Sequence, residues 1–175
     1  MNRRALMAAA LAPLAARVAT ASAQGGDTGV LGGLLALEQA QVAFYERAAG
    51  LAFHGQIAEL AGRIGDEERK HAQRLRALGA KPPAGAAPEI HFGKQDEFLR
   101  IAQRLEGLAV GAYNGAVSAL HDAELIQGIA SIAQVEARHS AAVRWLRQGE
   151  PAPRAFDRAF TPDRAQQALQ ALLSG

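Results

Sequence analysis

Apolar residues recur at spacings of three and four along most of the chain, and this is the period of an amphipathic helix. The pattern predicts four long helices, over residues 30–49, 55–78, 95–120 and 123–147. Gly50 and Gly79 follow the first two helices, as expected of helix ends. A shorter helix follows "PAPRAFDRAF", with Thr161 as its N-cap and Pro162 as its first residue. The sequence therefore predicts an all-α protein.

Charged residues interrupt the apolar stripe of each long helix. The first and third helices carry a Glu there, and the second and fourth carry Glu-x-x-His. A buried ionised carboxylate is costly unless it is paired or binds a metal. The spacing of three residues places a carboxylate and an imidazole on one helix face. Six residues are therefore candidate metal ligands: Glu38, Glu68, His71, Glu106, Glu136 and His139.

The chain repeats this pattern at an offset of 68 residues. The first copy holds Glu38, Tyr45, Glu68 and His71, and the second holds Glu106, Tyr113, Glu136 and His139. Antiparallel helix pairs with turns centred at residues 53 and 121 would bring the two Glu of each half to one height. The Pro- and Gly-rich connector, residues 80–94, reaches roughly 50 Å when extended. Because a 25-residue helix is about 37 Å long, the connector can cross the whole bundle, and both halves can form one site.

The repeated motif resembles that of the ferritin-like superfamily. Its two copies are "EQAQVAFY" with "EERKH" and "EGLAVGAY" with "EARH". The tail "PAPRAFDRAFTPDRAQQAL" is similar to the ferritin-like subfamily that includes desiccation-related proteins. The resemblance covers residues 30–147 and implies an antiparallel four-helix bundle with a long crossover between its second and third helices. Residues 148–175 would form a C-terminal extension with a short helix.

The resemblance also implies a centre of two divalent metal ions. Glu68 and Glu136 would bridge the ions, Glu38 and Glu106 would be terminal ligands, and each ion would bind one of the two His. Four carboxylates would balance the charge of two divalent ions. Oxygen and imidazole ligands suit iron or manganese, and the resemblance favours iron.

Two further positions near the candidate ligands have alternative interpretations. Tyr45 and Tyr113 would hydrogen-bond to ligand carboxylates and so support catalysis, or they are ordinary core aromatics. Glu67 is turned about 100° from Glu68 on the helix, so solvent exposure is expected for it.

The function implied by the resemblance is oxidoreduction of Fe(II), O2 or peroxide, of the ferroxidase or peroxidase type. A manganese pair would instead allow catalase-type chemistry. The chain has no Cys, so it has no rubredoxin-type centre, and a peroxidase would need an external electron donor. Ala109 stands where peroxidase-type rubrerythrins carry a further carboxylate. The alternative is a non-enzymatic metal-binding or stress-protective bundle. Since the Pro-rich tail is unlike the final helix of cage-forming ferritins, a monomer or homodimer is expected.

Residues 1–23 have the pattern of a secretory signal: a basic start, an Ala/Leu stretch and the small residues Ala21-Ser22-Ala23. Arg3-Arg4 resembles the twin-arginine motif, although Ala8 replaces its usual lysine, so Sec export stays open. An exported, periplasmic protein without a membrane span is expected. Removing this segment takes away three of 19 basic and none of 17 acidic residues. The 16 remaining basic residues give no sign of nucleic-acid binding. Residues 24–29 are expected to be a flexible start.

Overall fold

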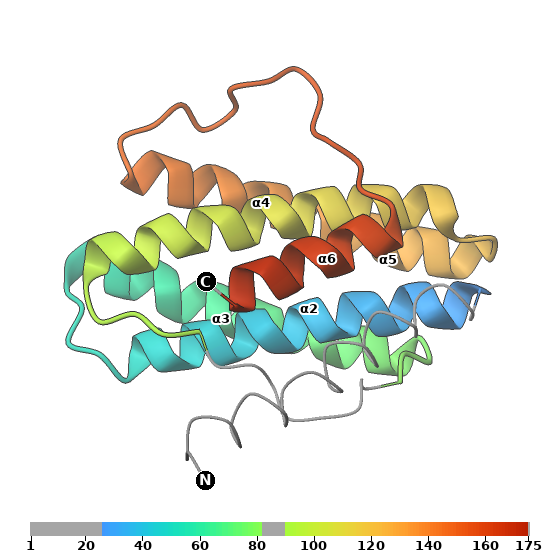
Figure 1. Cartoon of the computed structure of the whole chain (residues 1–175), viewed down its shortest axis with the longest axis horizontal. Helices are drawn as coiled ribbons and strands as arrows, with labels where there is room; N and C mark the ends of the chain where they lie inside the picture. The colour runs from blue at the N-terminus through green and yellow to red at the C-terminus, as the bar shows by residue number, and fades with distance from the viewer. Residues whose placement is uncertain (1–25, 82–89, 175) are drawn as a thin grey trace, which may run out of the picture.

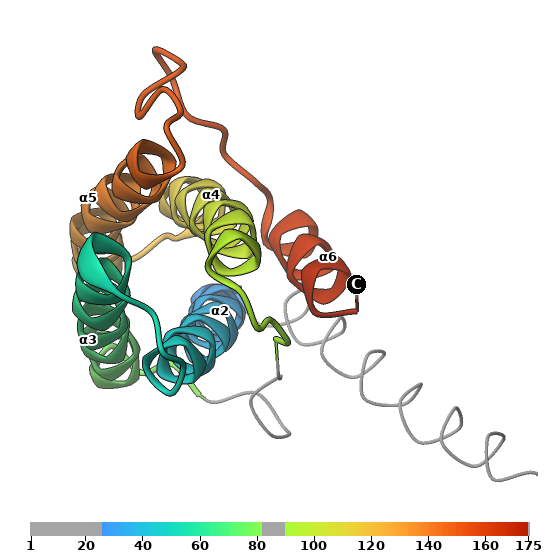
Figure 2. The same cartoon turned by 90° about the vertical axis from the view of Figure 1, so that its left-hand side faces the viewer.

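The computed structural model describes residues 26–81 and 90–174 and consists of helices joined by turns and loops (Figure 1). The predicted signal segment and most of the connector lie outside the described residues. The helices are α2 (Gly26–Ala49), α3 (Gly55–Ala77), α4 (Gln95–Ala119), α5 (Ala123–Leu146) and α6 (Pro162–Leu173). The four long helices form a bundle, and α6 lies outside it against α2 and α4 (Figure 2). The predicted all-α four-helix bundle with a short C-terminal helix is confirmed.

The start of α2 differs from the sequence prediction. Residues 26–29, expected to be flexible, form the first turn of the helix. The carboxylate of Asp27 accepts hydrogen bonds of 3.1 Å from the backbone N–H groups of His121 and Asp122, and Val30 and Leu31 are buried. These tertiary contacts fix a segment whose Gly-rich sequence has little helix propensity of its own.

Hydrogen bonds between loops establish the direction of each helix. The N–H of His54, before α3, donates to Oε1 of Gln95, at the start of α4, at 3.2 Å, so these two helices begin at the same end. The contacts of Asp27 place the start of α2 beside the turn between α4 and α5. Hence α3 ends and α4 begins at opposite ends of the bundle (Figure 1). This confirms the long crossover, which lets all four helices face one centre.

Aromatic residues fill the end of the bundle where α3 and α4 begin. The ring of Phe44 stacks on Phe98 with centroids 5.1 Å apart and lies 4.8 Å from the ring of Phe92. All three side chains are buried, and each contributes about 1.5–3 kcal/mol by leaving water. Arg47 donates to the carbonyl oxygen of Phe92 at 2.9 Å. This cluster anchors the end of the crossover where α4 begins.

The segment that precedes α6 packs closely against two glycines on α4. The N–H of Phe160 donates to the carbonyl of Gly111 at 2.8 Å, and a Cβ on Gly115 would lie 1.6 Å from the carbonyl oxygen of Phe160. Thr161 caps α6 by accepting a hydrogen bond of 3.4 Å from the N–H of Arg164, and Pro162 is its first residue, as predicted. No helix in the part of the chain that the structure describes has both the length and the apolar character needed to span a membrane.

Candidate metal centre

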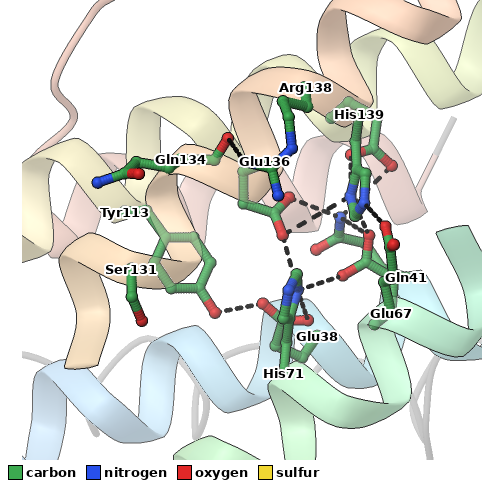
Figure 3. Close-up of polar contacts among 12 residues, drawn as sticks. Glu38, Gln41, Glu67, His71, Tyr113, Ser131, Gln134, Glu136, Arg138 and His139 are labelled. Carbon is green, nitrogen blue, oxygen red and sulfur yellow. Dashed lines mark hydrogen bonds and ion pairs between the residues drawn. The ribbon is translucent and has the colours of Figure 1, made fainter.

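All six predicted ligands meet in the middle of the bundle. Figure 3 shows Glu38, His71, Glu136 and His139 among them. Helices α2 and α4 each supply one Glu, while α3 and α5 each supply a Glu and a His. The four Glu side chains are 0% exposed, and the two His are 7% and 4% exposed. The antiparallel turns at residues 50–54 and 120–122 give this result, because they bring the ligands of each half to one height.

The ligand atoms form two overlapping groups that could each hold a metal ion, with all atoms of a group within 4.8 Å of one another. Glu68 and Glu136 belong to both groups, and these are the residues to which the family resemblance gives a bridging role. The group that we call the His71 group adds Glu38 and His71, and the His139 group adds Glu106 and His139.

Burial disfavours the ionised form of three of these carboxyl groups. Loss of hydration raises the pKa of Glu38, Glu68 and Glu106 well above the usual value, and the negative charge of neighbouring carboxylates raises it further. Several buried atoms of the cluster have no hydrogen-bond partner: Oε2 of Glu38 and Glu106, Oε1 of Gln41 and Glu136, and Nδ1 of His139. A cation bound among them would satisfy both the charge and the unpaired atoms, so the donor set fits a metal.

The two imidazoles present Nδ1 to the carboxylates. Nδ1 of His71 lies 2.9 Å from both Oε2 of Glu68 and Oε1 of Glu136. Burial lowers the pKa of His71, but the close contact with Glu136 and the negative charge of the nearby carboxylates outweigh this, so the pKa is raised. Nδ1 of His139 lies 3.0 Å from Oε1 of Glu68 but makes no hydrogen bond.

Both tyrosines hydrogen-bond to candidate ligands, as one of the two sequence interpretations expected. The hydroxyl of Tyr45 donates to Oε1 of Glu106 at 2.6 Å, and that of Tyr113 donates to Oε1 of Glu38. Each bond crosses between α2 and α4 instead of staying on its own helix. Burial and the adjacent carboxylates raise the pKa of both phenols well above the usual value, so both remain hydrogen-bond donors at neutral pH.

Gln41 is a member of the site that the sequence analysis missed. It is fully buried, and its Nε2 donates long hydrogen bonds to Oε1 of Glu68 (3.3 Å), Oε2 of Glu136 (3.4 Å) and Oε1 of Glu106 (3.5 Å). A signal was available, because Gln41 follows Glu38 by three residues and therefore shares its face of the helix.

Glu67 is partly exposed to solvent, as expected, but it also contacts a candidate ligand, which the sequence did not predict. Its side chain is only 38% exposed, and its Oε2 lies 2.6 Å from Nε2 of His139. Burial acts to raise the pKa of Glu67, but the hydrogen bond and charge of His139 outweigh it, so the pKa is lowered. The helical angle of Glu67 is as predicted, but only the packing of α5 against α3 shows that His139 occupies that direction.

Comparison with known proteins concerns the fold that brings these residues together. Residues 26–149 match the family model for the ferritin-like domain. No curated protein matches the sequence. A solved structure of a conserved hypothetical protein from Mycobacterium tuberculosis is 19% identical and aligns with a TM-score of 0.61 over 75% of this chain and 96% of that chain. At that identity the likeness concerns the fold alone. The family match covers most of the chain, and the chain therefore belongs to the ferritin-like domain family.

Proposed function

We propose that this protein binds two divalent metal ions, iron in preference to manganese, and acts as an oxidoreductase on Fe(II), O2 or peroxide. The observation that carries the proposal is the pair of overlapping ligand groups that share Glu68 and Glu136. Four buried carboxylates carry the charge that two divalent ions neutralise, and the two imidazoles supply one nitrogen ligand to each ion.

The chain's own residues would hold and shield this centre. Glu38 and His71 would complete one position, and Glu106 and His139 the other. When bound, two Fe(II) ions supply one electron each, and with two protons these reduce one peroxide to two waters. Tyr45 and Tyr113 are positioning residues, because their hydroxyls orient the carboxylates of Glu106 and Glu38. The electrons for repeated peroxide reduction would come from an external donor, since the chain has no Cys to form a second redox centre.

The second candidate function is metal binding without turnover, in a structural or stress-protective role. The almost complete burial of all six ligands favours it, because a substrate must reach the ions through a closed core. For either function, the signal pattern of residues 1–23 supports a site of action outside the cytoplasm, and we propose the periplasm.

The deciding experiment begins with metal analysis of the protein purified from its native compartment. We expect about two ions of iron or manganese per chain. O2 uptake after anaerobic Fe(II) loading and steady-state peroxide consumption are then measured for the wild type, Glu68→Ala and Glu136→Ala. Glu59→Ala, which changes an exposed carboxylate on α3, is the matched control.

If the wild type and the control turn over substrate and both ligand variants lose this activity, the oxidoreductase function is supported. Two bound ions without turnover would favour the second candidate. Turnover that survives both ligand substitutions would refute the site.

A further inference from the structure

The internal repeat provides a comparison between the two halves of the metal centre. At the offset of 68 residues, every candidate ligand and both tyrosines have an identical counterpart. Two residues that contact the ligands do not: the counterpart of Glu67 is Val135, and that of Gln41 is Ala109. The inference below rests on the two-metal centre of the proposed function.

The first difference concerns Nε2 of the two imidazoles, the ring nitrogen that points away from the ligand carboxylates. Nε2 of His139 lies 2.6 Å from the carboxylate of Glu67. Val135 has no polar side-chain atom, and no residue in the described ranges hydrogen-bonds to Nε2 of His71. A carboxylate that accepts the N–H of a metal-binding His fixes its tautomer and makes its other nitrogen a stronger donor. Only His139 has this support.

The state of the two Nδ1 atoms agrees with this difference. Nδ1 of His139 has no hydrogen bond, although it faces the carboxylates, so an incoming cation displaces no hydrogen bond at this atom. Nδ1 of His71 is engaged with Oε2 of Glu68 at 2.9 Å. A metal ion in the His71 group must displace that hydrogen bond before it can bind the imidazole.

The second difference also lies in the His139 group. The amide of Gln41 donates to one oxygen each of Glu68, Glu106 and Glu136. These are all three carboxylates of the His139 group, whereas the His71 group shares only Glu68 and Glu136 with them. The amide therefore holds them together before any cation arrives, which lowers the cost of ordering them. Ala109 offers no equivalent donor to the His71 group.

We propose that Glu67 and Gln41 make the two metal positions unequal, so that the His139 group binds its ion more tightly and fills first. Glu67 is the principal positioning residue, acting on the metal through His139. The order and affinity of metal loading are measured directly, without an activity assay.

The metal-free protein is titrated with Mn²⁺, and free Mn²⁺ is followed by its electron paramagnetic resonance signal. We expect two binding steps for the wild type. Glu67→Val, which installs the residue of the other half, should weaken the tighter step about 10- to 100-fold and leave the weaker step unchanged. Val135→Ala is the matched control at the equivalent position and should change neither step.

Gln41→Ala installs the residue of the other half in the same way and should weaken the tighter step more than the weaker one. His139→Asn should remove the tighter step, whereas His71→Asn should keep it. If Glu67→Val fails to fold, as judged by circular dichroism, Glu67→Gln takes its place and should also weaken the tighter step.

Three results would overturn the inference and leave the two-metal centre intact: equal binding of both ions by the wild type, an unchanged tighter step in the folded Glu67 variant, or survival of the tighter step in His139→Asn but not in His71→Asn. Failure of the wild type to bind any Mn²⁺ or anaerobic Fe²⁺ would instead refute the proposed function.

Discussion

Replacing Glu38 by Gln should raise the stability of the metal-free protein and reduce the stability gained on binding metal. Glu38 is fully buried, one of its oxygens has no hydrogen-bond partner, and burial raises its pKa well above the usual value. Gln has nearly the same shape and still offers an oxygen to the hydroxyl of Tyr113. An unpaired buried charge is costly, and replacing a buried ion pair by neutral residues is often neutral or stabilises a protein by about 1–4 kcal/mol. We therefore expect the metal-free variant to be more stable than the wild type.

With metal bound, this advantage should shrink or be lost. An ion present at 100 times its Kd stabilises the folded state by about 2.7 kcal/mol. If loss of the carboxylate raises the Kd of that ion about a hundredfold, the stabilisation by the ion falls to about 0.4 kcal/mol. The variant therefore loses about 2.3 kcal/mol of metal-linked stability, and about 2–4 °C of Tm accompanies each kcal/mol in a chain of this size. Its total gain on adding Mn²⁺ should be smaller by about 5–9 °C.

The assay is thermal unfolding followed by circular dichroism at pH 7, with chelator and then with Mn²⁺. Glu59→Gln, an exposed carboxylate on α3, should follow the wild type under both conditions. A metal-free Glu38→Gln protein that melts below the wild type would refute the reasoning, because the carboxylate would then stabilise the empty bundle. An unchanged metal-induced shift would show that Glu38 is not a ligand.

Three further predictions follow from the same contacts. The metal-free protein should lose stability as the pH rises above about 4.5, the ordinary pKa of Glu, because the unfolded chain then releases protons that the buried carboxyls retain. Urea unfolding in chelator from pH 4 to 8 measures this change. A free energy of unfolding that does not vary with pH would contradict it. Gly115→Ala should destabilise the protein by about 1–3 kcal/mol, because its Cβ would lie 1.6 Å from the Phe160 oxygen. Gly107→Ala, where a Cβ meets nothing within 4 Å, should leave the protein unchanged or stabilise it by up to about 1 kcal/mol. Equal stability of the two variants would argue against the close contact between Phe160 and Gly115. Tyr45→Phe and Tyr113→Phe should each cost about 1–3 kcal/mol in the metal-free form and weaken Mn²⁺ binding about tenfold, and unchanged binding would leave the hydroxyls without a role at the centre.

The helices and the six buried ligands were predictable because both depend on short-range periodicity. The spacing of Glu68 and His71 places them on one helix face in any fold, and the offset of 68 residues repeats that face in the second half. The turns at residues 50–54 and 120–122 lie where the equal heights of the glutamates require them. The crossover followed from the same symmetry, since only a full-length return lets both halves meet.

Contacts between helices could not be derived in this way. The angle of Glu67 on α3 was known, but its contact with His139 depends on where α5 packs. The same holds for the crossed bonds of Tyr45 and Tyr113 and for the helical turn fixed by Asp27. The sequence by itself determined which residues share a face of each helix, because that depends on 3.6 residues per turn. Only the tertiary structure decided which face meets which neighbour, because the packing of side chains between helices sets their distance and rotation.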